Sequence, residues 1–288
     1  MLICIPTSRS KTQYFINQAY ADYVQEAGYT AVMFAEQSDP IKVAGICDGL
    51  LLPGGIDLDP TFYGEDNVHS IGVDPAKDDY ERSLLHAFIS VGKPIFGICR
   101  GFQLLVREYK RLQEAKLMSE YSVYYQHIND HSLATSLDLP RFAFSHSVFA
   151  DRNYLYNEDH TAYKRTFVNS MHHQALLLKP GRGVHGKIVR NMGGIIAIAT
   201  AAYGLEDSKS MSNYRVAEAI MIRDWGESRI MAVQWHPEEL KDIALLKTFF
   251  ANENGTPIEI IKESESVIKT KKTKSKTKTA ENMEESNE

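Results

Sequence analysis

Short apolar segments alternate with helix-spaced segments through the first hundred residues. Four apolar runs, each bounded by turn residues, predict buried strands at residues 2–5, 29–34, 49–52 and 95–98. Between these runs, residues 14–27 and 79–91 carry apolar residues at helical spacing, and Gly28 is placed to end the first helix. Strands that alternate with helices form parallel sheets covered on both faces. The pattern therefore predicts an α/β fold.

The alternation weakens in the second half of the chain. Residues 119–165 are rich in Tyr, His and Asn and have poor helical periodicity, so short strands and loops are expected there. Three later strand-like runs and one last helix are predicted at residues 194–199, 217–222, 229–233 and 242–251. The chain shows no internal repeat, and residues 1–252 are interpreted as one domain.

The composition changes after residue 252. Residues 269–278 hold six lysines and no acid, and the final eight residues hold four glutamates. Such a segment cannot bury enough apolar surface to offset its ordering entropy, so residues 253–288 are predicted to be a disordered tail. A solubilising role is the simpler interpretation of this tail. Electrostatic binding of nucleic acid or another acidic partner is the alternative.

Bulk properties are those of an ordinary globular protein. Of the 288 residues, 43% are hydrophobic and 24% charged, and the net charge of -5 requires neither nucleic acid nor an anionic membrane as a partner. Cys4 and Cys47 lie in apolar runs, which suits buried thiols in a reducing compartment. No apolar run has the length of a membrane span, and the first residues do not form a signal peptide. A cytoplasmic location is therefore expected.

A cysteine with small neighbours is the strongest chemical signal. Cys99 follows an apolar strand and precedes a helix, with Gly97 and Gly101 two positions away on either side. A nucleophile on a sharp strand-to-helix turn needs small residues at those positions, because larger side chains would clash. The turn exposes the sulfur at the carboxyl edge of the sheet, beside a helix N-terminus that favours thiolate. Taken alone, the pattern is equally compatible with a buried structural cysteine.

A histidine and a carboxylate form the second signal. His236 ends a strand-like run, and Pro237 pushes it toward an extended conformation. Residues two apart in an extended segment project to the same side, so Glu238 could hold one imidazole nitrogen while the other faces Cys99. An isolated histidine of this kind is more often structural, but its combination with the cysteine turn favours a catalytic pair.

Five blocks along the chain resemble one family. They are residues 17–20, 51–60, 97–103, 168–174 and 233–238. In this order they resemble the class I glutamine amidotransferase-like superfamily, and within it the peptidase C26 group that contains γ-glutamyl-γ-aminobutyrate hydrolase. The resemblance covers about residues 1–250 and implies a three-layer α/β/α sandwich with a mostly parallel central sheet.

The resemblance also implies roles for individual residues. Cys99 would attack the γ-carbonyl of a γ-glutamyl amide, His236 would be the general acid and base, and Glu238 would orient it. The backbone N–H groups of Gly55 and Arg100 would hold the oxyanion. Near the glutamyl head group, the residues that match the family pattern are Gln103, His172, His173 and Gln174. Capping, packing or surface roles are the simpler alternatives for these four.

Neither a cofactor nor a metal ion is expected. His127 and His131 have the i, i+4 spacing of a metal pair, but no third ligand stands out near them in the sequence. Asp57 and Asp59 flank a turn closed by Pro60 and are interpreted as turn residues.

The sequence departs from the family pattern after the cysteine turn. The helix continues through residues 104–111, where the family usually has an Asn and a Gly-Gly step. The wall of the substrate pocket is therefore expected to be remodelled.

Three functions remain open at this point. The first is a stand-alone hydrolase that takes a small-molecule γ-glutamyl amide through a γ-glutamyl thioester. The second is a glutaminase subunit that supplies ammonia to a separate synthetase or modifying enzyme. The third is an inactive regulatory or binding protein with the same fold. The sequence also leaves the oligomeric state open, a homo-oligomer included.

Overall fold

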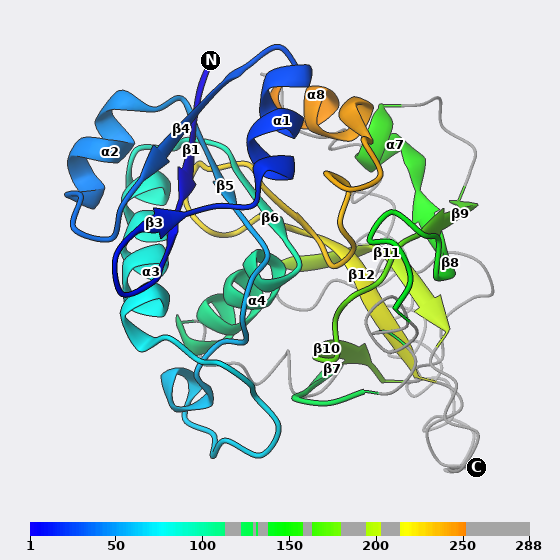
Figure 1. The fold of residues 1–288 in the computed structure, drawn as a ribbon. Helices are drawn as coiled ribbons and strands as arrows, with labels where there is room; N and C mark the ends of the chain where they lie inside the picture. The colour runs from blue at the N-terminus through cyan, green and yellow to red at the C-terminus, as the bar shows by residue number, and fades with distance from the viewer. Residues whose placement is uncertain are drawn as a thin grey trace, which may run out of the picture. The chain divides into compact units, whose positions relative to one another are not determined.

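Figure 1 shows the fold in a computed structural model, which describes residues 1–112, 122–128, 131, 138–157, 163–179, 194–202 and 214–251. The predicted tail, residues 253–288, lies outside these residues, so its disorder stays a prediction. Within the described part of the chain, no helix is both long enough and apolar enough to cross a membrane.

One large sheet organises the described residues. Its first five strands run parallel in the order β4 (Thr30–Phe34), β1 (Leu2–Pro6), β5 (Gly49–Leu52), β6 (Ile95–Ile98) and β13 (Ile230–Val233). The sheet continues antiparallel through β12 (Arg215–Ile222), β11 (Ile195–Ala202), β8 (His146–Asp151) and β9 (Tyr163–Val168). Two further strands, β10 (Ala175–Leu178) and β7 (Ser122–Tyr125), branch from β12. A separate pair consists of β2 (Ser8–Arg9) and β3 (Tyr14–Phe15).

Helices cover both faces of the parallel strands (Figure 1). On one side lie α2 (Pro40–Ile46), α3 (Pro75–Ser90) and α4 (Arg100–Leu112), and on the other α1 (Gln18–Glu26) and α8 (Ile243–Ala251). Successive side chains of β1 point to opposite faces of the sheet. Cys4 belongs to the core cluster shared with α2, α3 and α4, whereas Ile3 lies on the side of Phe250 in α8. Shorter helical turns are η1 (Pro60–Tyr63) and α7 (Arg152–Tyr156). The α/β fold with a central parallel sheet is thus confirmed.

Polar side chains fix the starts of several helices. Asn17, Asp39 and Asp74 accept hydrogen bonds from the first backbone N–H groups of α1, α2 and α3. Gly28 follows α1 with a φ of +87°, which confirms its predicted place at the helix end. In η1, Asp59 accepts from the Thr61 N–H at 2.9 Å, so it does form the turn that the sequence suggested.

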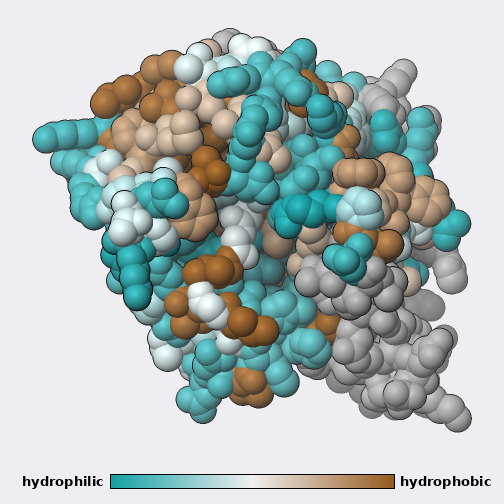
Figure 2. All heavy atoms as spheres, viewed as in Figure 1, coloured by the Kyte–Doolittle hydropathy of each residue, from teal (hydrophilic) through white to brown (hydrophobic). Residues whose placement is uncertain are grey.

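Sequence patterns missed several of these elements. No strand or helix was predicted at β2, α2, η1, α7 or β10. The helix expected over residues 14–27 begins only at Gln18, because residues 14–15 form β3, and α3 begins at Pro75 rather than at residue 79. Two isoleucines of α2, Ile41 and Ile46, are 76% and 58% exposed, and hydrophobic spheres lie beside hydrophilic ones around this helix in Figure 2. Outward apolar residues of this kind obscure the helical periodicity by which α2 could have been recognised.

Candidate active site

Cys99 lies on a sharp turn between β6 and α4. Its φ is +51°, a left-handed conformation that residues other than glycine rarely adopt. The turn is held from both sides: the Cys99 N–H donates to Val233 O at 2.8 Å, and its carbonyl accepts from the Gln103 N–H at 3.1 Å. The side chain is 7% exposed. The strand-to-helix turn predicted from the sequence is therefore present.

The two flanking glycines are required by space rather than by φ. A Cβ on Gly101 would lie 2.3 Å from Leu52 O, which is shorter than any tolerable contact. A Cβ on Gly97 would lie 2.8 Å from Leu105 Cδ1 and 2.9 Å from the Gly101 carbonyl carbon. Only hydrogen fits at both positions, so the first turn of α4 packs directly against β5.

His236 follows β13, which lies beside β6 in the sheet. The ring atom Nδ1 lies 2.6 Å from Glu238 Oε1, and both residues are 4% exposed. Burial alone would lower the pKa of His236. The Glu238 carboxylate and the Cys99 thiolate, which also hydrogen-bonds the ring, outweigh burial and raise that pKa to about 10. The structure therefore brings together the three residues that the sequence assigned to catalysis.

Two residues that sequence analysis missed hold this arrangement. Asn169 accepts from the His236 N–H at 3.0 Å, and its amide donates to His236 O at 3.1 Å and Arg141 O at 2.8 Å. Tyr20 Oη accepts from the Gly54 N–H at 2.9 Å. A Cβ on Gly54 would lie 2.9 Å from His236 Cε1, so this glycine, rather than Gly55, is where the backbone approaches the histidine most closely.

The two candidate oxyanion donors are the backbone N–H groups of Gly55, after β5, and Arg100, directly after Cys99. Gly55 follows β5 and is exposed, and a Cβ there would make only an ordinary contact with Arg100 Cδ at 3.5 Å. Arg100 opens α4, whose first N–H groups have no partner within the helix. Its guanidinium is buried and paired with Asp78 and Glu81 of α3.

The ion pairs of Arg100 with Asp78 and Glu81 join the start of α4 to α3. Burial alone would raise the pKa of Glu81, but Arg100 and Lys77 outweigh it, and the pKa is lowered. The Arg100 side chain therefore ties the first residue of α4 to α3.

The four predicted substrate-binding residues fall into different environments. Gln103 is buried in the first turn of α4, next to Cys99. Gln174 is fully buried; its Oε1 accepts from Tyr124 Oη at 2.7 Å, and its Nε2 donates to Ser70 Oγ at 2.9 Å. The side chain of His172 contacts Gln174 O and Glu218 instead.

His173 joins two distant blocks of the sequence. Its Nε2 lies 2.8 Å from Asp57 Oδ2, and this carboxylate, which outweighs burial, raises the pKa of His173. The Asp57 carboxylate also accepts from the Ile71 N–H at 2.8 Å. Asp57 is therefore more than the turn residue that the sequence suggested, because it ties the loop after β5 to the segment before β10.

The wall beyond α4 contains a stacked arginine. The Arg107 guanidinium carbon lies 3.6 Å from the ring centroid of Tyr63 and 3.5 Å from that of Tyr124, and Glu65 pairs with the same group at 3.0 Å. Helix α4 runs to Leu112, as the sequence predicted. Arg107 thus occupies part of the region where the chain departs from the family pattern; residues 113–121 lie outside the described part.

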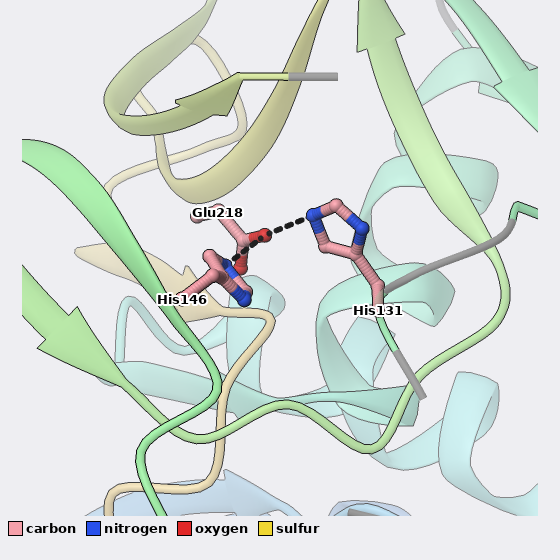
Figure 3. A group of neighbouring side chains, drawn as sticks. All are labelled: His131, His146 and Glu218. Carbon is pink, nitrogen blue, oxygen red and sulfur yellow. Dashed lines mark hydrogen bonds and ion pairs between the residues drawn. The ribbon is translucent and has the colours of Figure 1, made fainter. Parts of the chain in front are cut away.

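The i, i+4 histidine pair separates in the structure. His127 Nδ1 lies 3.5 Å from His173 Nδ1. His131 instead meets His146 and Glu218, residues that the sequence gave no reason to connect with it (Figure 3). No third ligand lies near His131 in the sequence, but the fold brings His146 and Glu218 close to it.

These features define an α/β protein with a cysteine, a histidine and a carboxylate gathered at the carboxyl ends of β6 and β13. The peptidase C26 family matches residues 6–238, and the chain belongs to this family. Its likeness to glutamine amidotransferase-like proteins is confirmed as well.

The chain is 28% identical over 235 residues to the glutamine amidotransferase-like protein YvdE of Lactococcus lactis subsp. lactis (strain IL1403), covering 78% of this chain and 80% of that protein. It is 28% identical over 193 residues to a γ-glutamyl-γ-aminobutyrate hydrolase of Escherichia coli O157:H7, covering 66% and 64%. A solved structure, the glutaminase domain of Trypanosoma brucei CTPS with bound acivicin, is 14% identical with a TM-score of 0.49, covering 89% of this chain and 95% of that one.

Proposed function

We propose that this protein is a cysteine-dependent hydrolase of γ-glutamyl amides. The observation that carries the proposal is the position of Cys99 on its turn, beside a histidine that is itself held by Glu238. A thiol nucleophile needs a base beside it and a group that orients the base. Membership of the peptidase C26 family and likeness to a γ-glutamyl-γ-aminobutyrate hydrolase support the choice of substrate class.

In the first half of the reaction, Cys99 Sγ attacks the γ-carbonyl carbon and a C–S bond forms. The tetrahedral intermediate then collapses, the C–N bond breaks, and His236 gives its proton to the leaving amine. The raised pKa of His236, about 10, keeps the ring protonated and the proton available at neutral pH. The products of this half are a free amine and a γ-glutamyl thioester on Cys99.

In the second half, water attacks the thioester carbonyl. Neutral His236 accepts a proton from this water, a C–O bond forms, and the C–S bond breaks to release glutamate and the Cys99 thiolate. The backbone N–H groups of Gly55 and Arg100 are proposed to donate to the oxyanion in both halves. Gln103, His173 and Gln174 are proposed to line the glutamyl side of the pocket, whereas His172 would act only through its neighbours.

The surface beside the Gly55 turn favours an amine that carries an alkyl chain. Ile56 and Ile71 are 43% and 73% exposed and lie next to the Asp57 backbone, which pairs with that of Ile71. Free glutamine releases only ammonia and has no group to place against these side chains. Contacts with a remote part of the substrate can be used in the transition state and raise kcat/KM.

The experiment compares substrates on the purified protein alone. We expect kcat/KM for γ-glutamyl-γ-aminobutyrate or a γ-glutamyl polyamine to exceed that for glutamine by at least about tenfold, the effect of one apolar contact in a pocket. Ile71→Ser should reduce this ratio and leave turnover of glutamine unchanged. Cys99→Ala provides the inactive control.

Two other outcomes would point elsewhere. A protein that is inert on every γ-glutamyl amide until a partner is added would be a glutaminase subunit that supplies ammonia. A protein that binds a γ-glutamyl amide but never turns it over, with or without a partner, would be a binding or regulatory protein.

A further inference from the structure

Three histidines converge on one buried carboxylate oxygen outside the catalytic group. Glu218 Oε1 lies 3.1 Å from His146 Nε2, 3.4 Å from His131 Nε2 and 3.6 Å from His172 Nε2. Glu218 is fully buried, and the side chains of His131, His146 and His172 are 6%, 17% and 1% exposed. Figure 3 shows His131 and His146 directed at Glu218 from two sides. We call these four residues the Glu218 cluster.

The spacing of these atoms matches the corners of a metal site. A tetrahedral zinc ion with bonds of about 2.0–2.1 Å needs ligand atoms roughly 3.3–3.4 Å apart. The three distances to Glu218 Oε1 lie around that value. The ligand atoms of His131, His146 and Glu218 are also all within 4.8 Å of one another. These three atoms could surround one ion after small side-chain movements. His172 Nε2, 3.6 Å from Glu218 Oε1, would have to turn toward the other two histidines to become the fourth ligand.

The tautomer of His172 argues for a cation at this point. His172 Nδ1 lies 2.9 Å from Gln174 O, so it carries a hydrogen and donates it. In the neutral ring, Nε2 then presents a lone pair to the Glu218 carboxylate, and two lone pairs repel unless a cation lies between them. Metal-binding histidines commonly donate their other N–H to a backbone carbonyl in this way.

Glu218 itself lacks enough partners for a buried charge. Its second oxygen, Oε2, has no hydrogen-bond partner among the residues that the structure describes. A buried carboxylate is costly unless it is paired and hydrogen-bonded, or coordinates a metal ion. A purely structural hydrogen-bonded cluster would leave the lone pair of His172 Nε2 facing the carboxylate without compensation, and the buried negative charge without a cation.

We propose that the Glu218 cluster binds one divalent transition-metal ion, with zinc as the best match. Three imidazoles and one carboxylate are ligands that zinc accepts in tetrahedral geometry. Four protein ligands leave no open position, so the ion would be structural rather than catalytic. The ligands come from four separate segments: the loop after β7, the start of β8, the segment between β9 and β10, and β12.

The proposed site is joined by backbone hydrogen bonds to the two segments that position His236. The Gln234 N–H donates to Glu218 O at 2.7 Å. On the other side, the Ser170 hydroxyl and the His172 N–H both donate to His131 O. The ion would therefore fix the segment that contains Asn169, and its removal should loosen the fold there before it affects the chemistry at Cys99.

The test measures metal binding by the full chain, free of any affinity tag. The protein is stripped with a chelator and dialysed against micromolar zinc, and bound zinc is then measured by elemental analysis. We expect about one zinc ion per chain and a higher Tm with zinc than without it. Glu218→Gln and His146→Ala should each weaken zinc binding by at least about tenfold. His127→Ala is the matched control and should bind zinc like the unaltered protein.

Two further measurements keep the result decisive. Cys99→Ser is expected to retain the ion. If Cys99→Ser loses zinc while His146→Ala keeps it, the zinc binds at the catalytic pair, and the proposal is refuted. Cobalt added to the unaltered chain should give visible bands of four-coordinate geometry without a thiolate charge-transfer band, even if the cluster variants do not fold. The absence of zinc and cobalt binding by the folded chain would also refute it.

Discussion

The three cysteines are all buried but have different neighbours. Cys4 and Cys47 are fully buried in the core and contact each other, which raises the pKa of Cys4. Cys99 is 7% exposed, lies at a helix N-terminus and interacts with His236. Thiolate reactivity follows such electropositive, partly accessible surroundings.

We therefore expect brief iodoacetamide treatment at neutral pH to modify Cys99 first. Mass spectrometry of the digested protein would locate the label, and His236→Ala should slow the modification because the thiolate loses its cationic partner. Labelling of Cys47 ahead of Cys99 in the folded protein would contradict the assignment of the nucleophile.

Glu238 sets the protonation of His236. Its carboxylate is the largest of the groups that raise the pKa of His236 to about 10, so Glu238→Gln should lower that pKa. The alkaline limb of the rate profile, where the general acid loses its proton, should then move to lower pH. The variant should also lose less activity than His236→Ala.

The same shift has a consequence for stability. Because the folded pKa of His236 lies above the value of about 6.5 for a free histidine, its contribution to stability is complete below that pH. The contribution is lost as the pH rises toward about 10. Urea titrations between these limits should show a decline that is smaller in Glu238→Gln; an identical decline would contradict the proposed partner.

Short-range sequence patterns made the candidate catalytic residues predictable. Cys99 could be found because its glycines lie two residues away, and Glu238 because it lies two residues after His236. Asn169, Tyr20 and Glu218 could not, since their partners lie far along the chain and only the fold brings them together. No spacing in the sequence encodes such a pairing.

At the scale of elements, the junction of β5, β6 and α4 decides the position of Cys99. Gly101 lets the first turn of α4 touch Leu52 at the end of β5. Gly101→Ala would force that turn away from the sheet, and we expect it to lower the free energy of unfolding by roughly 1–3 kcal/mol, the usual cost of overpacking. Urea denaturation gives this value, and kcat should fall with it.

Gly45 in α2 is the matched control for this substitution. A Cβ there would meet nothing within 4 Å, so Gly45→Ala should be neutral or should stabilise the helix by up to about 1 kcal/mol. Equal effects of the two substitutions would show that space at the turn is not what requires Gly101.

Four of the parallel strands, β1, β5, β6 and β13, were predictable because each is a short apolar run between turns, buried from both sides. In the antiparallel extension, β11 and β12 were predicted, but β8 and β9 were not located within the region expected to hold short strands. Over the parallel half, α2 was missed because isoleucines lie on its outer surface. Residues 119–165 were correctly expected to lack long helices in the parts that the structure describes, but their pairing in the sheet depends on distant strands.

At the scale of the whole sheet, the candidate catalytic residues lie at the seam between its parallel and antiparallel halves. β13 is parallel to β6 on one side and antiparallel to β12 on the other. His236 follows β13, Cys99 follows β6, and Glu218 lies in β12. Asn169 bridges the seam, because it bonds His236 from the segment that follows β9.

Asn169→Ala tests this bridge. The substitution removes three hydrogen bonds and leaves the buried backbone N–H of His236 without its partner, at about 1–3 kcal/mol; the His236 carbonyl keeps the Leu240 N–H at 3.4 Å. We expect a loss of stability of that order and a fall in kcat larger than any rise in KM, because the general acid would be displaced while the substrate pocket remains. Asn153→Ala, on a partly exposed residue of α7, should change neither quantity. If Asn169→Ala lost stability but kept its kcat, the residue would support the fold without positioning His236, and the seam would not control the chemistry.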